Sequence, residues 1–154
     1  MVVASSAVAD AVKTVIGPSN LLLADGAQAL LSNRGEEGVA LTLQGLETAS
    51  GSAEFKMAHS NLCAGYLLID KPLDALRHCN EVLAKDPNHW RTYNNRALVY
   101  MRLERYDEAD ADIRKGQSLR PGSTKLKIVK GMYLDETQPV RETIELDERR
   151  ETAD

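Results

Sequence analysis

Residues 90–123 read WRTYNNRALVYMRLERYDEADADIRKGQSLRPGS, and residues 56–89 before them read KMAHSNLCAGYLLIDKPLDALRHCNEVLAKDPNH. Several residues recur at the same place in the two segments, 34 positions apart. The matched pairs are Asn61 and Asn95, Tyr66 and Tyr100, Ala75 and Ala109, and Pro87 and Pro121. A fixed period of this size indicates an array of stacked structural repeats.

Each segment divides into two stretches with the apolar periodicity of a helix. The expected helices cover about 57–69 and 72–85 in the first segment, and about 91–103 and 107–119 in the second. A proline closes each segment because proline cannot continue the preceding helix. The sequence therefore predicts an all-α protein built from helical hairpins.

The two segments resemble the tetratricopeptide repeat family, whose 34-residue pattern sets small and aromatic residues at fixed positions. The matching residues are Tyr93, Arg96, Ala97, Tyr100, Ala109, Ile113, Gly116 and Pro121 in one segment, and His59, Leu62, Cys63, Tyr66, Ala75, Cys79, Val82 and Pro87 in the other. The resemblance implies a right-handed α-solenoid of antiparallel helix-turn-helix units with terminal capping helices. In such an array the first helix of each unit lines a concave groove.

Weaker signals extend the array on both sides of 56–123. A degenerate unit is expected at 19–52, where Gly26 takes the small position and Ser50-Gly51-Ser52 replaces the closing proline. A further helix is expected at 123–134, because Ser123 is a good N-cap residue. This helix would cover the apolar surface of the unit 90–123.

The two ends of the chain differ from the repeats. Residues 1–18 fit an N-terminal amphipathic helix, but the small residues of Ser5–Ala9 also fit the remnant of a signal peptide. A cytoplasmic protein is expected in the first case, and a periplasmic or otherwise exported one in the second. Residues 135–154 carry eight acidic and three basic side chains, and a short helix is expected to start at Thr137-Gln138-Pro139. Its apolar face would hold Val140 and Ile144.

Composition and motifs exclude several classes of function. The formal net charge is -4, so no general attraction to nucleic acid is expected. No stretch approaches about 18 consecutive apolar residues, so we expect no membrane insertion. The sequence has no P-loop, dinucleotide-binding glycine pattern, G-x-S-x-G or H-E-x-x-H motif. We therefore predict a protein that is not an enzyme and needs no cofactor.

The family resemblance also implies which residues bind a ligand, because family ligands contact fixed positions along each first helix. The corresponding residues are Met57, Ser60, Asn61, Ala64, Leu67 and Leu68, then Arg91, Asn94, Asn95, Leu98, Met101 and Arg102, and in the degenerate unit Asn20, Leu23, Ala24, Ala27, Leu30 and Leu31. Asparagine amides can both donate to and accept from a peptide backbone, and arginine donates to carboxylates. The leucines can alternatively be read as core between helices.

These residues predict an adaptor that holds a peptide segment of a partner protein in the groove. Self-association into a homodimer is the alternative. Some co-chaperones of the family grip a terminal carboxylate with a clamp of five residues. Asn61 and Arg91 match that clamp, whereas Leu23, Ala27 and Asn95 do not, so a clamp is the less favoured reading.

The two cysteines are expected to face each other, because Cys63 and Cys79 lie symmetrically about the turn near residue 71. We expect two reduced core residues, since free cysteine is often buried. A disulfide is the alternative if the Cα atoms approach within about 7 Å, and it would fit an exported protein. His59 shares a helix face with Cys63 and would complete three metal ligands, although a buried histidine is the simpler reading. His78 is expected to point outward.

Overall fold

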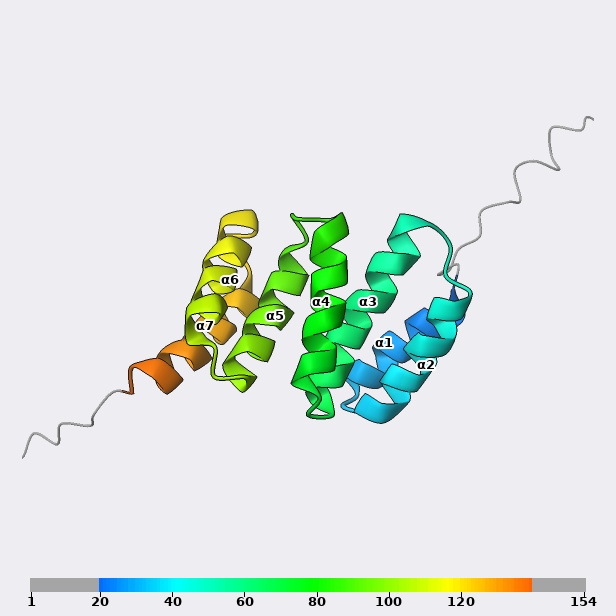
Figure 1. Ribbon diagram of the computed structural model, residues 1–154, viewed down its shortest axis with the longest axis horizontal. Helices are drawn as coiled ribbons and strands as arrows, with labels where there is room; N and C mark the ends of the chain where they lie inside the picture. Colours follow the sequence, from blue (N-terminus) through cyan, green and yellow to red (C-terminus); the bar gives the residue numbers. More distant parts are fainter. Residues whose placement is uncertain (1–19, 140–154) are drawn as a thin grey trace, which may run out of the picture.

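The computed structural model describes residues 20–139, and in this range the chain forms seven α-helices. They are α1 (Leu21–Leu31), α2 (Gly35–Glu47), α3 (Gly51–Leu68), α4 (Pro72–Lys85), α5 (Trp90–Arg102), α6 (Tyr106–Leu119) and α7 (Thr124–Thr137). The first six pack as three hairpins in a row, and α7 lies at the end of the row beside α5 and α6 (Figure 1). The predicted all-α array of helix-turn-helix units is confirmed. None of the seven helices is long and apolar enough to cross a membrane.

The three hairpins turn in the same way. Asn33, Asp70 and Glu104 each have a positive φ, of 59°, 57° and 57°, directly after the first helix of the hairpin. In each turn the next N–H donates to the carbonyl five residues back, as Arg105 does to Tyr100 at 2.8 Å. This left-handed ending satisfies carbonyls that the helix leaves unpaired. The repetition shows that the degenerate segment at the start of the array forms the same kind of unit.

The first hairpin brings its two helices unusually close. A Cβ at Gly26 on α1 would overlap the hydroxyl of Thr42 on α2 and would lie 3.1 Å from the Gly38 carbonyl. Only hydrogen fits at this crossing, which explains why glycine stands at the small position of the unit. Thr42 is fully buried and donates from Oγ1 to the Gly38 carbonyl at 2.7 Å.

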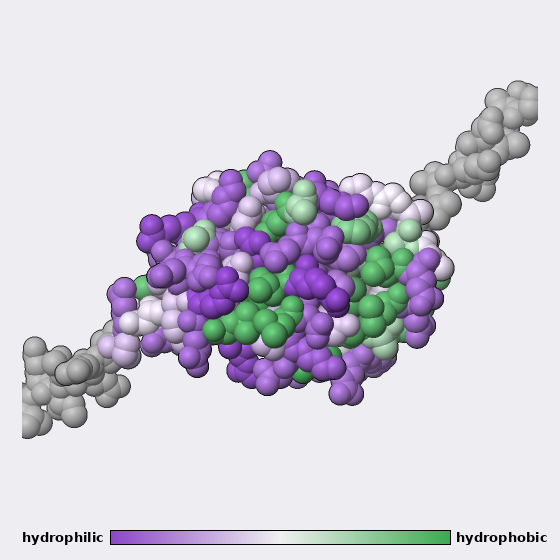
Figure 2. All heavy atoms as spheres, viewed as in Figure 1, coloured by the Kyte–Doolittle hydropathy of each residue, from purple (hydrophilic) through white to green (hydrophobic). Residues whose placement is uncertain are grey.

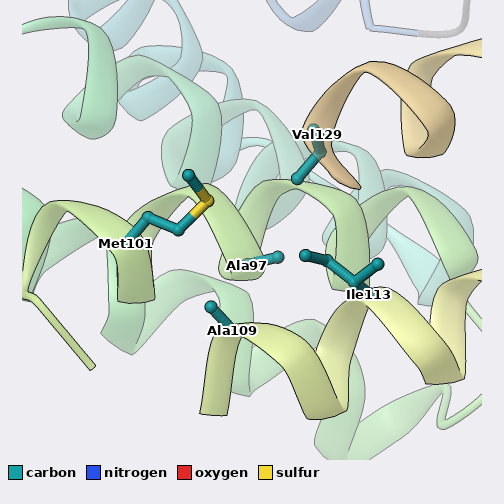
Figure 3. Close-up of a cluster of buried hydrophobic side chains, with 5 residues drawn as sticks. All are labelled: Ala97, Met101, Ala109, Ile113 and Val129. Atoms are coloured by element: carbon teal, nitrogen blue, oxygen red, sulfur yellow. The ribbon is translucent and has the colours of Figure 1, made fainter. Parts of the chain in front are cut away.

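The core is a series of small clusters, each shared by neighbouring hairpins. One cluster joins α5, α6 and α7 (Figure 3) and consists of Ala97, Met101, Ala109, Ile113 and Val129. Another joins α3, α4 and α5 through Cys63, Ala75, Cys79 and Val99. On α7, Leu126 is fully buried and Val129 is 3% exposed, so this helix covers the apolar side of the last hairpin. Repeat arrays are stabilised through such contacts between neighbours.

Two helix boundaries differ from the sequence predictions. Helix α3 begins at Gly51 rather than near residue 57, because the Ser50 N–H donates to the Glu54 carboxylate at 2.8 Å and so caps an earlier start. Helix α7 continues to Thr137, whose hydroxyl donates to the Tyr133 carbonyl at 2.7 Å. The helix expected to start at Thr137-Gln138-Pro139 falls almost entirely on residues outside the described range.

Other expectations about the chain ends concern residues outside the described range. These are the N-terminal helix or signal-peptide remnant in 1–18 and the apolar face with Val140 and Ile144.

Candidate functional site

The first helices of the three hairpins enclose a hollow of about 410 Å³ together with the start of α7. The lining residues are Ala27, Leu30 and Leu31 from α1, Ser60, Asn61, Ala64, Leu67 and Leu68 from α3, Trp90, Arg91, Asn94, Asn95 and Leu98 from α5, and Lys125 from α7. We call this hollow the upper groove. It follows from the register of the repeats, since each hairpin presents its first helix to the same side.

A second hollow of about 490 Å³ continues the first and shares Leu67, Leu68 and Leu98 with it. Its other lining residues are Met101, Arg102, Glu104, Tyr106, Met132 and Glu136. We call it the lower groove. The two hollows thus form one surface along α3, α5 and α7. Apolar patches bordered by hydrophilic side chains are visible on the face shown in Figure 2.

Most predicted ligand-contacting residues lie in these two hollows. Ser60, Asn61, Ala64, Arg91, Asn94, Asn95 and Leu98 line the upper groove, and Met101 and Arg102 line the lower one. Met57 lines neither, although it is 43% exposed. Asn20 instead caps α1 and accepts from the Leu23 N–H at 3.2 Å. Leu23 is fully buried, so its placement among the ligand-contacting positions is wrong.

The leucines of the groove are not simply core. Leu31 is 79% exposed and Leu68 is 49% exposed, and both line the upper groove. Leu30 and Leu67 are half-buried beside them. The reading of these four leucines as inter-helix core is therefore wrong for Leu31 and Leu68. Exposed apolar side chains gathered in a hollow are typical of a binding surface.

The asparagines of the groove differ in their burial and in the hydrogen bonds that they already make. The Asn61 Nδ2 donates to the Leu23 carbonyl at 3.2 Å and so links α3 to α1. Asn94 is 7% exposed, and its Nδ2 lies 3.4 Å from the Asn95 Oδ1. The Asn94 Oδ1 is buried without a hydrogen-bond partner among the described residues. A buried amide oxygen without a donor is costly, which makes this side of α5 receptive to a ligand N–H.

The charge of the upper groove is positive. Arg91 and Lys125 line it, no acidic residue does, and neither cation has an ion-pair partner among the described residues. The Arg91 guanidinium lies 4.8 Å from the centre of the Trp90 ring, which holds it at the start of α5. The sequence patterns did not select Trp90. Lys125 is predicted by sequence, because with Asn95 it matches the clamp positions in the register of the next unit.

Two histidines, the buried His78 and the half-buried His59, form a pair between α4 and α3. The Nδ1 atoms of His59 and His78 lie 3.0 Å apart, and His78 is only 7% exposed. The prediction that His78 points outward is wrong, because its ring stacks on Tyr66 with centroids 5.4 Å apart. Its Nε2 is buried without a partner. A buried N–H without an acceptor costs more than an unused lone pair, so we assign the proton of His78 to Nδ1, which donates to His59.

Burial, together with the nearby His59, lowers the pKa of His78 from 6.5 to about 4. The groups that face it include Arg77, which lowers the pKa, and Asp74 and Glu81, which raise it. Burial also lowers the pKa of His59, where Glu81 acts against it and Lys85 and Arg77 act with it. Between pH 6.5 and about 4, His78 therefore binds a proton more readily in the unfolded chain than in the folded one.

We expect the free energy of unfolding to have its full value above pH 6.5 and to fall by about 2 kcal/mol between pH 7 and pH 5. Urea unfolding followed by circular dichroism at pH 7, 6 and 5 measures this change. A His78→Gln variant keeps a hydrogen-bond donor near His59 but does not titrate, so its stability should change much less over the same range. Equal pH dependence in the two proteins would contradict this account of the pair.

The cysteines are joined rather than reduced. Cys63 and Cys79 form a disulfide with Cα atoms 5.1 Å apart, and both residues are fully buried. The expectation of two reduced cysteines is wrong, because α3 and α4 approach closely enough at these two residues for the bond to form. Both sulfur atoms are occupied in this bond, and the described residues contain no group of three side chains suited to a metal ion.

The comparisons with known proteins agree with the geometry. A family model described as tetratricopeptide repeat matches residues 78–111. The chain therefore contains a tetratricopeptide repeat. Solved structures of the same fold include the first such domain of Spaghetti (RPAP3) bound to an HSP90 peptide, SRMEEVD, with a TM-score of 0.64, 16% identity, and 75% of this chain and 90% of that chain covered. The domain of P58(IPK) has a TM-score of 0.67 at 22% identity and covers 79% of this chain and 35% of that one.

Relatives by sequence are larger proteins. A stretch of 73 residues is 32% identical to human DnaJ homolog subfamily C member 3, and it covers 47% of this chain and 14% of that protein. A stretch of 71 residues is 31% identical to human FK506-binding protein-like, and it covers 46% of this chain and 20% of that protein. The match to this tetratricopeptide repeat chain thus spans at most about a fifth of either relative.

Proposed function

We propose that this chain is a non-catalytic interaction module that holds a peptide segment of a partner protein in the upper groove. The observation that carries the proposal is that exposed leucines lie in the same hollow as two cations without an ion-pair partner in residues 20–139. Leu31 and Leu68 offer apolar contact at one side, while Arg91 and Lys125 offer charge at the other. A peptide with an apolar side chain and a nearby carboxylate satisfies both.

Related folds support a peptide ligand. The first such domain of Spaghetti (RPAP3) is bound to the HSP90 peptide SRMEEVD, and the second such domain of human RPAP3 to the HSP70 peptide SGPTIEEVD. Both peptides carry apolar residues and end in acidic ones. The groove of this chain differs from the five-residue carboxylate clamp, since Leu23 is fully buried and Ala27 carries no polar group. We therefore infer an anion site made by Arg91 and Lys125 instead.

Phage display of random peptides on the purified protein tests this function. Enriched peptides should carry apolar and acidic residues, and an Arg91→Ala/Lys125→Ala variant should bind them about tenfold more weakly or worse. Each charged hydrogen bond to a ligand contributes about 1.5–3 kcal/mol, and 1.4 kcal/mol corresponds to a factor of ten. Binding is measured by isothermal titration calorimetry.

A Lys127→Ala variant is the matched control, because Lys127 is exposed on the same helix as Lys125 but lies outside both hollows. It should bind the selected peptides as the wild type does. Failure to enrich any peptide, or equal binding by the double variant and the wild type, would remove the upper groove as the binding site.

A further inference from the structure

The lower groove has the opposite charge to the upper one. Glu104 and Glu136 line it, and neither forms an ion pair among the described residues. Arg102 also lines it, but its Nε donates to the Asp70 carboxylate at 2.8 Å, so its charge is already compensated. The lower groove is therefore net negative, whereas the upper groove is net positive.

Tyr106 lines the lower groove together with the two carboxylates. It is the first residue of α6, and Glu136 lies in the last turn of α7, so these two helix ends meet at the lower groove. Partial burial raises the pKa of Tyr106, and the charges of Glu136 and Glu104 raise it further, because both carboxylates lie near the hydroxyl. The two acids thus lie around one ring at the far end of the groove. Between them and the cations lie Leu67, Leu68 and Leu98, which both hollows share.

The distance between the positive and the negative end of the groove follows from two residues on α7. Lys125 and Glu136 lie eleven residues apart on the same α7 helix, which corresponds to about 16 Å at a rise of 1.5 Å per residue. An extended peptide covers this distance in about five residues at roughly 3.3 Å each. One short peptide can therefore contact both ends of the groove at once.

We propose that the groove selects peptides with an acidic end and a basic end separated by a short apolar stretch, the acidic end at Arg91 and Lys125 and the basic end at Glu104 and Glu136. This inference rests on the proposed function and adds the chemistry of the partner segment to it. A negative lower groove disfavours an entirely acidic peptide, because a carboxylate placed beside Glu104 and Glu136 is repelled. Selectivity thus comes from charge order as well as from apolar contact.

Three synthetic peptides test the inference, namely KKGLLGEE, QQGLLGEE and EEGLLGEE, and the first two are also made in the reverse order. Fluorescence anisotropy should give the tightest binding for the peptide with lysines, in one of its two directions, and the weakest for the peptide acidic at both ends. We expect about a tenfold difference between these two at low salt and a smaller one at high salt. The preferred direction then shows how the peptide chain runs along the groove.

A Glu104→Lys/Glu136→Lys variant should reverse the order, so that EEGLLGEE binds more tightly than KKGLLGEE. Circular dichroism verifies that the variant is folded, and a Glu108→Lys variant serves as control because Glu108 lies outside both hollows. Equal binding of the three peptides to wild type, still weakened by Arg91→Ala/Lys125→Ala, would overturn this inference and leave the proposed function standing. No binding of any peptide to wild type, with the display selection also empty, would overturn both.

Discussion

A protein in which Asp112 is replaced by alanine is expected to unfold with a free energy about 3–5 kcal/mol lower than the wild type. Asp112 on α6 is 5% exposed, and it accepts from the Arg96 Nε at 2.7 Å and from the Arg96 Nη2 at 2.8 Å. Removal of the carboxylate leaves the largely buried guanidinium without its main partner. Of its hydrogen bonds, only the one from the Arg96 Nη1 to the Asn80 Oδ1, at 2.8 Å, would remain.

Urea unfolding at pH 7 measures the change, and an exposed ion pair in the same hairpin gives the control. The Arg105 Nη2 lies 2.6 Å from the Glu108 Oε1, but about half of each side chain is exposed. Exposed pairs contribute roughly 0–1 kcal/mol, so a Glu108→Ala variant should lose no more than that. Equal losses in the Asp112 and Glu108 variants would show that burial of the Arg96 pair does not determine its contribution.

The repeat explains why the buried pair sits where it does. Leu62 and His78 stand 34 residues before Arg96 and Asp112. In the middle hairpin the buried His78 lies beside the rings of His59 and Tyr66. In the last hairpin the Arg96 guanidinium lies 5.5 Å from each of the rings of Tyr93 and Tyr100, at the equivalent positions. The two hairpins thus fill the same space with different polar groups between two rings.

This comparison shows which features a sequence can predict in such an array. The period of 34 places the helices, the turns and the side of each helix that lines the groove, because these depend on local spacing. It does not indicate that His78 is buried, since its ring is held by His59 and Tyr66 on the facing helix. The partner of a polar residue at a repeat position can therefore be predicted only when the residues on the facing helix of the same hairpin are considered with it.

In the candidate site, too, the sequence predicts what depends on local spacing but not what depends on contacts between helices. Asn61, Asn95 and Arg91 could be placed in the groove from their repeat positions alone. Leu23 could not, because its burial results from the close crossing of α1 and α2, where its side chain lies against Gly45. The pattern places Met101 and Arg102 in the lower groove, but it does not predict Tyr106 and Glu136, since these two residues come from helices that the ligand-contacting positions do not include.

Reduction of the Cys63–Cys79 disulfide is expected to lower the free energy of unfolding by about 3 kcal/mol. The bond joins α3 to α4 across a sequence separation of 16 residues. A crosslink of this span restricts the unfolded chain, and in the chain-entropy account this restriction is the main source of the stabilisation. Urea unfolding with and without dithiothreitol measures the difference, and titration of thiols in denaturant without reductant should find none.

A Cys63→Ala/Cys79→Ala variant distinguishes the effect of losing the disulfide from any other effect of the reductant. Alanine already occupies the position of Cys63 in the next repeat, at Ala97, so the hairpin accommodates it. The variant should be less stable than the oxidised wild type and should not respond to dithiothreitol. Two titratable thiols in the purified wild type, or equal stability with and without reductant, would contradict the bond. Because disulfides persist in oxidising compartments, its presence in protein purified without oxidant would favour an exported protein over a cytoplasmic one.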